Sequence, residues 1–292
     1  MSNELIVTAI DEYGAFVRNL GPANFKAEVH GHPIPILSSG VNMRPGRVVI
    51  LLDSSGSMNA ENSRLLARAA AIDAVQSLNP STQLSVVVFA DEPKALATFG
   101  TSRASIIKVL NTIDWGKRYG KGHTALLDAI LAAAKLLDPP QLGDAIYIIT
   151  DGGDNTSHSR FPQVQDELLS KGIRLFAFLI YNLGPPSVEE QRGPSEIWNL
   201  ANATGGWSLG YRSPTLAKNP YAAPNIQEPS PAQPLYEQVN NFYTVRLGGL
   251  NTFSKPEKWK LEIRGEEGIN PKRIHLQYPS RLLPCARSLS AK

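Results

Sequence analysis

Two kinds of hydrophobic pattern alternate through the middle of the chain. The first kind is a near-continuous run of Val, Ile, Leu and Phe with the length of a buried strand. Four such runs lie at 47–53, 84–90, 145–151 and 173–181. The second kind has apolar residues at helical spacing, and it occupies 63–78, 103–113, 124–137, 163–170 and 194–206. Strands that alternate with helices predict an α/β fold with a doubly wound, mostly parallel sheet.

The two ends of the chain have a different hydrophobic pattern. Residues 4–37 form short alternating apolar runs separated by turn signals, and strand-like runs return between 242 and 278. Between 213 and 234 the chain holds six prolines without any periodicity, which is typical of a linker. The pattern predicts four parts, which are listed in chain order. They are a β-rich flank at 1–45, the α/β domain at 46–212, the linker at 213–234 and a β-rich flank at 235–285. We expect the two flanks to pair into one small β-sandwich-like domain.

Composition and charge exclude several classes of protein. The 292 residues include 29 Lys and Arg against 26 Asp and Glu, so the net charge is only +3 and no basic stripe suggests nucleic-acid binding. No stretch approaches the ~20 apolar residues that span a membrane. The single cysteine, Cys285, cannot form an internal disulfide. The compartment depends on whether a signal peptide has been removed: the protein is periplasmic or extracellular if so and cytoplasmic otherwise, and the oligomeric state stays open.

The strand at 47–53 ends in a group of oxygen donors. Asp53 is followed by Ser55 and Ser57 in a D-x-S-x-S pattern, and Gly56 allows the backbone to turn. Ligands bind at the carboxyl ends of the strands in open α/β sheets. Ligand sets made only of oxygen suit Mg²⁺ or Ca²⁺ better than zinc or copper. The same residues could simply make the turn and cap the next helix, and this stretch alone leaves the two interpretations even.

Two further stretches favour the metal. Thr124 directly precedes a predicted helix, and Asp151 lies at the carboxyl end of another buried strand. Both residues would project from the same edge of the sheet as Asp53. Three separate loops therefore predict one ion site.

The stretches VVILLDSSGSM, GHTALLDAI and IYIITDGGDN, in this order, resemble the von Willebrand factor A (VWA) domain with its metal-ion-dependent adhesion site (MIDAS). The resemblance covers about residues 47–209 and implies a Rossmann-like fold. It also implies Mg²⁺, or Mn²⁺ or Ca²⁺, as the ion. The ligands that it implies are Asp53, Ser55, Ser57, Thr124 and Asp151. The ion would capture an acidic side chain of a protein partner. The flanks resemble, more loosely, a bacterial group of VWA-related proteins described from acidobacteria.

Residues next to the predicted ligands allow more than one interpretation. His123 replaces a glycine that is frequent in the family, and it could contact a ligand or be a tolerated loop residue. Asp154 and Asn155 could hold a second ion or form a solvated acidic turn. Asp128 could orient the site or lie on the helix surface.

Enzymatic alternatives fit the sequence poorly. The stretch at 116–124 has three residues between its glycines where a phosphate-binding P-loop needs four, and a glycine follows its lysine where a hydroxyl is needed. Position 55 is Ser where the D-x-D-x-T phosphatases need Asp, and no G-x-S-x-G elbow surrounds either serine. We therefore expect a non-enzymatic adhesion or assembly module. The alternatives are an accessory subunit of an ATPase or metal-chelatase complex, and a structural protein with a vestigial metal site.

Overall fold

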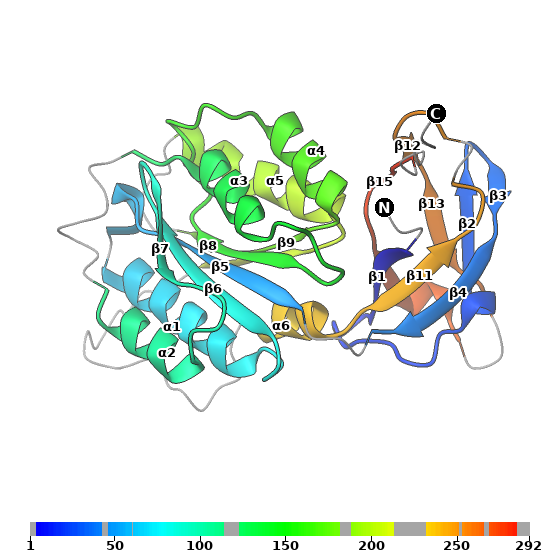
Figure 1. Ribbon diagram of the computed structural model, residues 1–292, viewed down its shortest axis with the longest axis horizontal. Coiled ribbons are helices and arrows are strands. Elements are labelled where there is room, and N and C mark those ends of the chain that lie inside the picture. Colours follow the sequence, from blue (N-terminus) through cyan, green and yellow to red (C-terminus); the bar gives the residue numbers. More distant parts are fainter. Residues whose placement is uncertain are drawn as a thin grey trace, which may run out of the picture.

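Two folded units lie side by side in a computed structural model of the protein (Figure 1). The structure describes residues 4–42, 46–59, 61–113, 123–181, 188–212, 232–250, 253–265 and 269–284. Most of the predicted linker, up to residue 231, and Cys285 lie outside the described residues.

A six-stranded sheet forms the centre of the larger unit, in the order β10-β9-β8-β5-β6-β7. Its strands are β5 (Arg47–Asp53), β6 (Gln83–Phe89), β7 (Pro93–Ala97), β8 (Ala145–Thr150), β9 (Arg174–Tyr181) and β10 (Ser208–Arg212). All neighbours in this sheet are parallel except the β6–β7 pair, which is antiparallel. The predicted fold class, a mostly parallel sheet within an α/β fold, is confirmed.

Helices cover both faces of this sheet (Figure 1). They are α1 (Glu61–Ser77), α2 (Arg103–Asn111), α3 (Leu126–Leu136), α4 (Phe161–Lys171), α5 (Val188–Ala203) and α6 (Gln233–Asn240). Residues of α1, α2 and α6 belong to one buried cluster, and residues of α3, α4 and α5 to the other. Strand β5 contributes to both, since Val48 and Ile50 lie in the first cluster while Val49 and Leu51 lie in the second. A strand that is buried on both sides must be apolar throughout, which explains the near-continuous runs.

The smaller unit is built from both ends of the chain and contains the remaining strands. They are β1 (Glu4–Asp11), β2 (Phe25–Val29), β3 (His32–Ile34), β4 (Ile36–Val41), β11 (Tyr243–Leu247), β12 (Glu257–Lys258), β13 (Lys260–Ile263), β14 (Ile274–Gln277) and β15 (Arg281–Leu282). The first strand pairs with β11 through its first half and with β14 through its second half. Strand β13 pairs with β2. A separate apolar cluster fills this unit.

Two elements differ from the sequence-based expectation. Helix α6 occupies residues predicted as linker and β-rich flank, and its Leu235, Tyr236 and Val239 are buried against the larger unit. The Tyr236 hydroxyl donates to the Ala70 carbonyl at 3.1 Å. This helix has only eight residues and follows a proline-rich segment, so its apolar spacing is too short to stand out. Edge strand β7 leaves no clear signal either, because most of its residues are exposed and its apolar run is limited to Ala95–Ala97.

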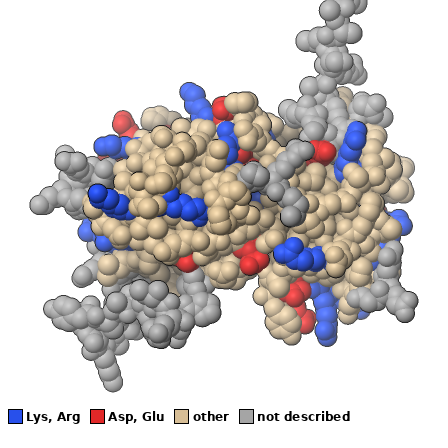
Figure 2. Space-filling model, turned by 60° about the horizontal axis from the view of Figure 1, so that its bottom comes forward, with Lys and Arg blue, Asp and Glu red and all other residues tan. Residues whose placement is uncertain are grey.

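Charged side chains of both signs are interspersed on the face shown in Figure 2, without a broad patch of one sign. Among the described residues, no helix combines the length and the apolar composition needed to cross a membrane.

Candidate metal centre

The predicted ligands lie at the carboxyl edge of the six-stranded sheet. Asp53 is the last residue of β5, and Asp151 directly follows β8, which is the neighbouring strand. Thr124 lies two residues before α3. All three side chains are almost fully buried, with exposed fractions of 0% for Asp53, 3% for Asp151 and 4% for Thr124. Buried polar groups need hydrogen-bond partners or a bound ion, and these three groups lie at one edge of the sheet.

The loop after β5 is organised around Asp53. Its Oδ1 accepts a hydrogen bond from the Ser55 backbone N–H at 2.9 Å. The Ser55 and Ser57 hydroxyl oxygens lie 3.0 Å apart, within hydrogen-bond distance. A short 3-10 helix, Gly56–Asn59, then leads toward α1. The D-x-S-x-S pattern thus brings a carboxylate and two hydroxyls together within one tight loop.

Thr150 is a part of the site that sequence reasoning missed. Its hydroxyl donates to Asp53 Oδ2 at 2.6 Å and accepts from the Gly152 N–H at 3.0 Å. One side chain therefore connects the loop after β5 with the loop after β8. The available signal was a single hydroxyl residue at the end of the apolar run of β8, directly before Asp151.

The two carboxylates at the site disfavour each other's charge. Burial of Asp53 and, next, the negative charge of Asp151 raise the pKa of Asp53 from 3.8 to about 7, although hydrogen bonds from Ser55 and Thr150 oppose the shift. A buried carboxylate beside a second one is costly to ionise unless a cation lies nearby. The electrostatics of this edge therefore favour a bound positive charge.

Thr124 is fixed to the loop that follows Asp151. Its N–H donates to Asn155 Oδ1 at 2.8 Å, and its carbonyl accepts from the Asn155 N–H at 3.0 Å. Asp154 Oδ1 accepts from the Leu126 N–H at 3.0 Å. Asn155 and Asp154 thus join the second and third loops, a structural role that the sequence alone did not reveal.

Asp128 also belongs to this framework. Its carboxylate accepts from the backbone N–H groups of His158, at 2.9 Å, and Ser159, at 3.0 Å. It therefore anchors the far end of the loop that carries Asp154 and Asn155. His123, in contrast, is exposed.

The start of α5 packs tightly against the loop that carries Asp151. A Cβ on Gly193 would lie 1.7 Å from the Gly152 carbonyl oxygen, and one on Gly152, whose φ is +88°, would lie 2.8 Å from the Pro194 nitrogen. No side chain fits on either side of this contact. The two glycines therefore set the position of the backbone next to Asp151.

The donor set fits a divalent ion that prefers oxygen. Within the described ranges, no three His, Cys, Asp or Glu side chains form a metal-binding group. The predicted site instead combines two carboxylates with neutral hydroxyls. Such a mixture of oxygen donors suits Mg²⁺, Mn²⁺ or Ca²⁺.

The fold has counterparts among solved structures. Proximal thread matrix protein 1 from the mussel byssus, with zinc in its MIDAS motif, aligns with a TM-score of 0.54 and 18% identity over 72% of this chain and 50% of that chain. A second crystal form gives 0.51, with the same identity and coverage. An aerotolerance-related membrane protein from Bacteroides fragilis gives 0.49 and 18% identity over 66% of this chain and 98% of that chain.

Sequence comparison points to the same domain. No curated protein matches this chain. Residues 48–153 match the family model of the von Willebrand factor type A domain, a range that includes all five predicted ligands. The chain contains a von Willebrand factor type A domain.

Proposed function

We propose that the protein is a divalent-cation-dependent protein-binding module of the MIDAS type. Asp53, Ser55, Ser57, Thr124 and Asp151 hold the ion at the carboxyl edge of the sheet. An acidic side chain of a partner protein completes the ion's coordination. The function is binding and assembly, without catalysis.

The observation that carries this proposal is the buried carboxylate pair. Burial and the charge of Asp151 raise the pKa of Asp53 to about 7, so the ionised pair is unfavourable without a counter-charge. A divalent ion would supply that charge. The Ser55 and Ser57 hydroxyls, 3.0 Å apart in the same loop, offer the neutral oxygens that such an ion also needs.

The comparisons support a metal-dependent interaction module in general terms. The domain match includes all five proposed ligands, and the mussel protein binds zinc in its MIDAS motif. For this chain we propose Mg²⁺, with Mn²⁺ and Ca²⁺ as substitutes, because every proposed donor is an oxygen atom.

The ion supplies an electrophilic coordination position that a carboxylate from another molecule can occupy. The chain's own contribution is rigid placement: Thr150 and Ser55 orient Asp53, and Asn155 holds Thr124 against the loop of Asp151. A site that is organised in advance loses little entropy when a partner binds.

Thermal unfolding with and without metal tests the ion site. We expect Mg²⁺ or Mn²⁺ at millimolar concentration to raise the melting temperature, EDTA to reverse the shift, and Asp53→Ala to abolish it. The matched control is Asp91→Ala, which removes an exposed carboxylate just beyond the end of β6, at the same edge. It should leave the shift unchanged. Calorimetry that detects no ion binding to the wild-type protein would refute the site.

A pull-down in Mg²⁺ and in EDTA tests the partner. The immobilised full chain should retain a protein in Mg²⁺, release it in EDTA, and fail to retain it when Asp53 is replaced by Ala. Retention that is the same in all three conditions would show that the partner does not use the ion.

A further inference from the structure

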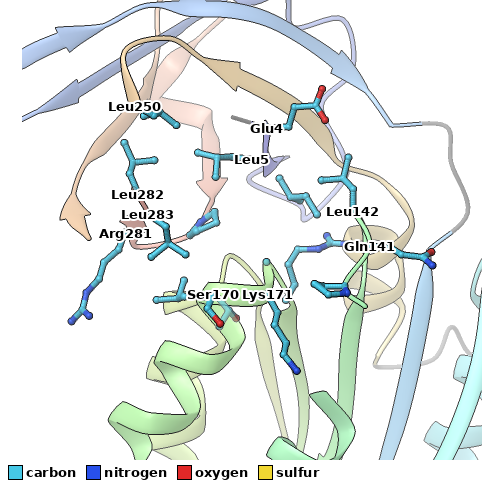
Figure 3. A pocket seen from close by; sticks show the side chains of 17 residues that line it. Glu4, Leu5, Gln141, Leu142, Ser170, Lys171, Leu250, Arg281, Leu282 and Leu283 are labelled. Atoms are coloured by element: carbon cyan, nitrogen blue, oxygen red, sulfur yellow. The ribbon is translucent and has the colours of Figure 1, made fainter. Parts of the chain in front are cut away.

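A cavity of about 220 Å³ lies between the two units, away from the metal centre. One wall comes from the larger unit, where α4 ends and β8 and β9 begin. The other wall comes from the first residues of β1 and from residues near β15. Figure 3 shows side chains from both units around this space.

Most of the cavity wall is apolar. Leu5, Leu250, Leu282 and Leu283 line it from the smaller unit, and Leu142 lines it from the segment before β8 (Figure 3). An apolar chain that enters this space would exchange water for leucine side chains. The walls therefore suit the hydrocarbon chain of a ligand.

The charged side chains at the rim do not offer their charges to the cavity. Lys171 pairs with Asp138 at 2.8 Å and with Glu167 at 3.0 Å, and Arg281 pairs with Asp166 at 3.3 Å. Figure 3 shows the ends of Lys171 and Arg281 pointing away from the space, and the same holds for the carboxylate of Glu4.

Arg174, the first residue of β9, also lines the cavity and is only 1% exposed. Its Nη atoms donate to the Gln238 and Val239 carbonyls of α6, at 2.9 and 3.2 Å. The guanidinium carbon lies 4.3 Å from the centre of the Phe242 ring. These contacts hold α6 and the segment that leads to β11, so Arg174 has a structural role at the junction of the units.

The structural contacts leave the charge of Arg174 without a carboxylate. Among the described residues, none forms a salt bridge with Arg174, and its Nε finds no hydrogen-bond acceptor. Burial lowers the pKa of its guanidinium to about 9, so the group is still charged at neutral pH. A buried charge of this kind is costly unless an opposite charge compensates it.

We propose that this cavity binds a small amphipathic carboxylate, whose apolar chain packs on the leucines while its negative charge compensates Arg174. The volume fixes the size of the ligand. An apolar cavity of about 150 Å³ accommodates benzene, so about 220 Å³ suits a molecule of about ten non-hydrogen atoms. Octanoate has this size and chemistry, and it serves as the probe.

Isothermal titration calorimetry on the full chain separates charge from hydrophobicity. We expect octanoate to bind one to one with a dissociation constant of about 0.1–1 mM. Octanamide has the same chain without the charge and should bind at least about tenfold more weakly. Equal affinity for the two probes, or no binding of octanoate up to about 10 mM, would overturn the proposal.

Two variants locate the binding. Leu142→Trp adds bulk to a half-buried wall residue and should weaken octanoate binding at least about tenfold. The matched control is Leu136→Trp, on the exposed face of α3 and outside the cavity lining, which should bind as the wild type does. Unchanged binding in Leu142→Trp would place the ligand elsewhere and refute the proposal.

Arg174→Gln tests the charge and should reduce the preference for octanoate over octanamide. If this variant does not fold, the comparison of the two probes on wild-type protein still decides the question. Asp53→Ala should bind octanoate normally, so failure of the metal site and failure of this cavity are distinguishable.

Discussion

Replacing Asp53 by Asn should have opposite effects on stability with and without metal. Between about pH 4 and pH 7 the folded protein binds more protons at Asp53 than the unfolded chain, because its folded-state pKa is about 7 and its ordinary value is 3.8. Stability contributed by this group is therefore complete below about pH 4 and is lost as the pH rises to about 7. The Asp53→Asn change removes this loss and also removes a ligand of the ion.

The pKa shift of Asp53 sets the approximate size of the effect in the metal-free protein. The difference between the pKa values of 3.8 and about 7 corresponds to a loss of about 4 kcal/mol of folding stability at pH values above 7, which the Asp53→Asn variant would regain. Part of this gain is lost in the variant, because an amide can accept the Ser55 N–H bond but must rearrange the contact with Thr150. We expect the metal-free variant to be about 1–3 kcal/mol more stable at about pH 8, which raises the melting temperature by several degrees.

In the presence of metal the order of stability is reversed, and the wild-type protein is more stable than the variant. At an ion concentration of about 1,000 times the dissociation constant, the wild-type protein gains about 4.1 kcal/mol, which exceeds the advantage of the metal-free variant, and the variant gains nothing. The assay is thermal unfolding of both proteins in EDTA and in Mg²⁺, at about pH 5 and about pH 8. A variant that is destabilised in EDTA by the same amount at both pH values would refute the view that the ionised pair is strained.

Three further predictions concern the framework. In the wild-type protein Arg47 donates from Nε and Nη2 to the two carboxylate oxygens of the buried Asp144, at 3.0 and 2.6 Å. Arg47→Ala leaves this carboxylate without its cation, and urea unfolding should show a loss of about 3–5 kcal/mol of stability. Gly193→Ala forces the Gly152 carbonyl away, and unfolding in Mg²⁺ should show a smaller metal-dependent shift than in the wild type. Burial acts to raise the pKa of Asp128, but hydrogen bonds from the next loop outweigh it and lower the pKa to about 2. The folding stability that ionised Asp128 contributes, measured by comparison with Asp128→Asn, should be present above about pH 4 and vanish as the pH falls to about 2.

The sequence predicted the sheet well because both of its faces are buried. Residues 48–52 and 145–149 lie between two helical layers and are therefore almost entirely apolar, which leaves a strong signal. Edge strand β7 and helix α6 leave weak signals. The first is mostly exposed, and the second is short and obtains its stability from packing on α1.

The candidate ligands stand out in the sequence because each lies at the boundary of a predicted element. Their supporting residues do not, because their roles depend on contacts between loops that are distant in sequence. Thr150 acts through Asp53, which lies 97 residues away, and Asn155 acts through Thr124, which lies 31 residues away. Arg174 is a similar case, since its partners in α6 are more than sixty residues away. Single polar residues such as Thr150, Asn155 and Arg174 form no periodic pattern in the sequence from which such contacts could be predicted.

The candidate metal centre and the cavity between the units lie at opposite ends of the same strands. Arg174 is level with Ala145 at the start of β8, and Asp151 comes six residues later, which corresponds to about 20 Å along the strand. Sites that are this far apart on a rigid, doubly covered sheet should contribute independently to stability. The shifts produced by Mg²⁺ and by octanoate should then add. A combined shift that departs from the sum would instead require a moving element that both ligands influence. Helix α6 would be the first element to test for such movement, because it packs on α1 and its Gln238 carbonyl accepts a hydrogen bond from Arg174.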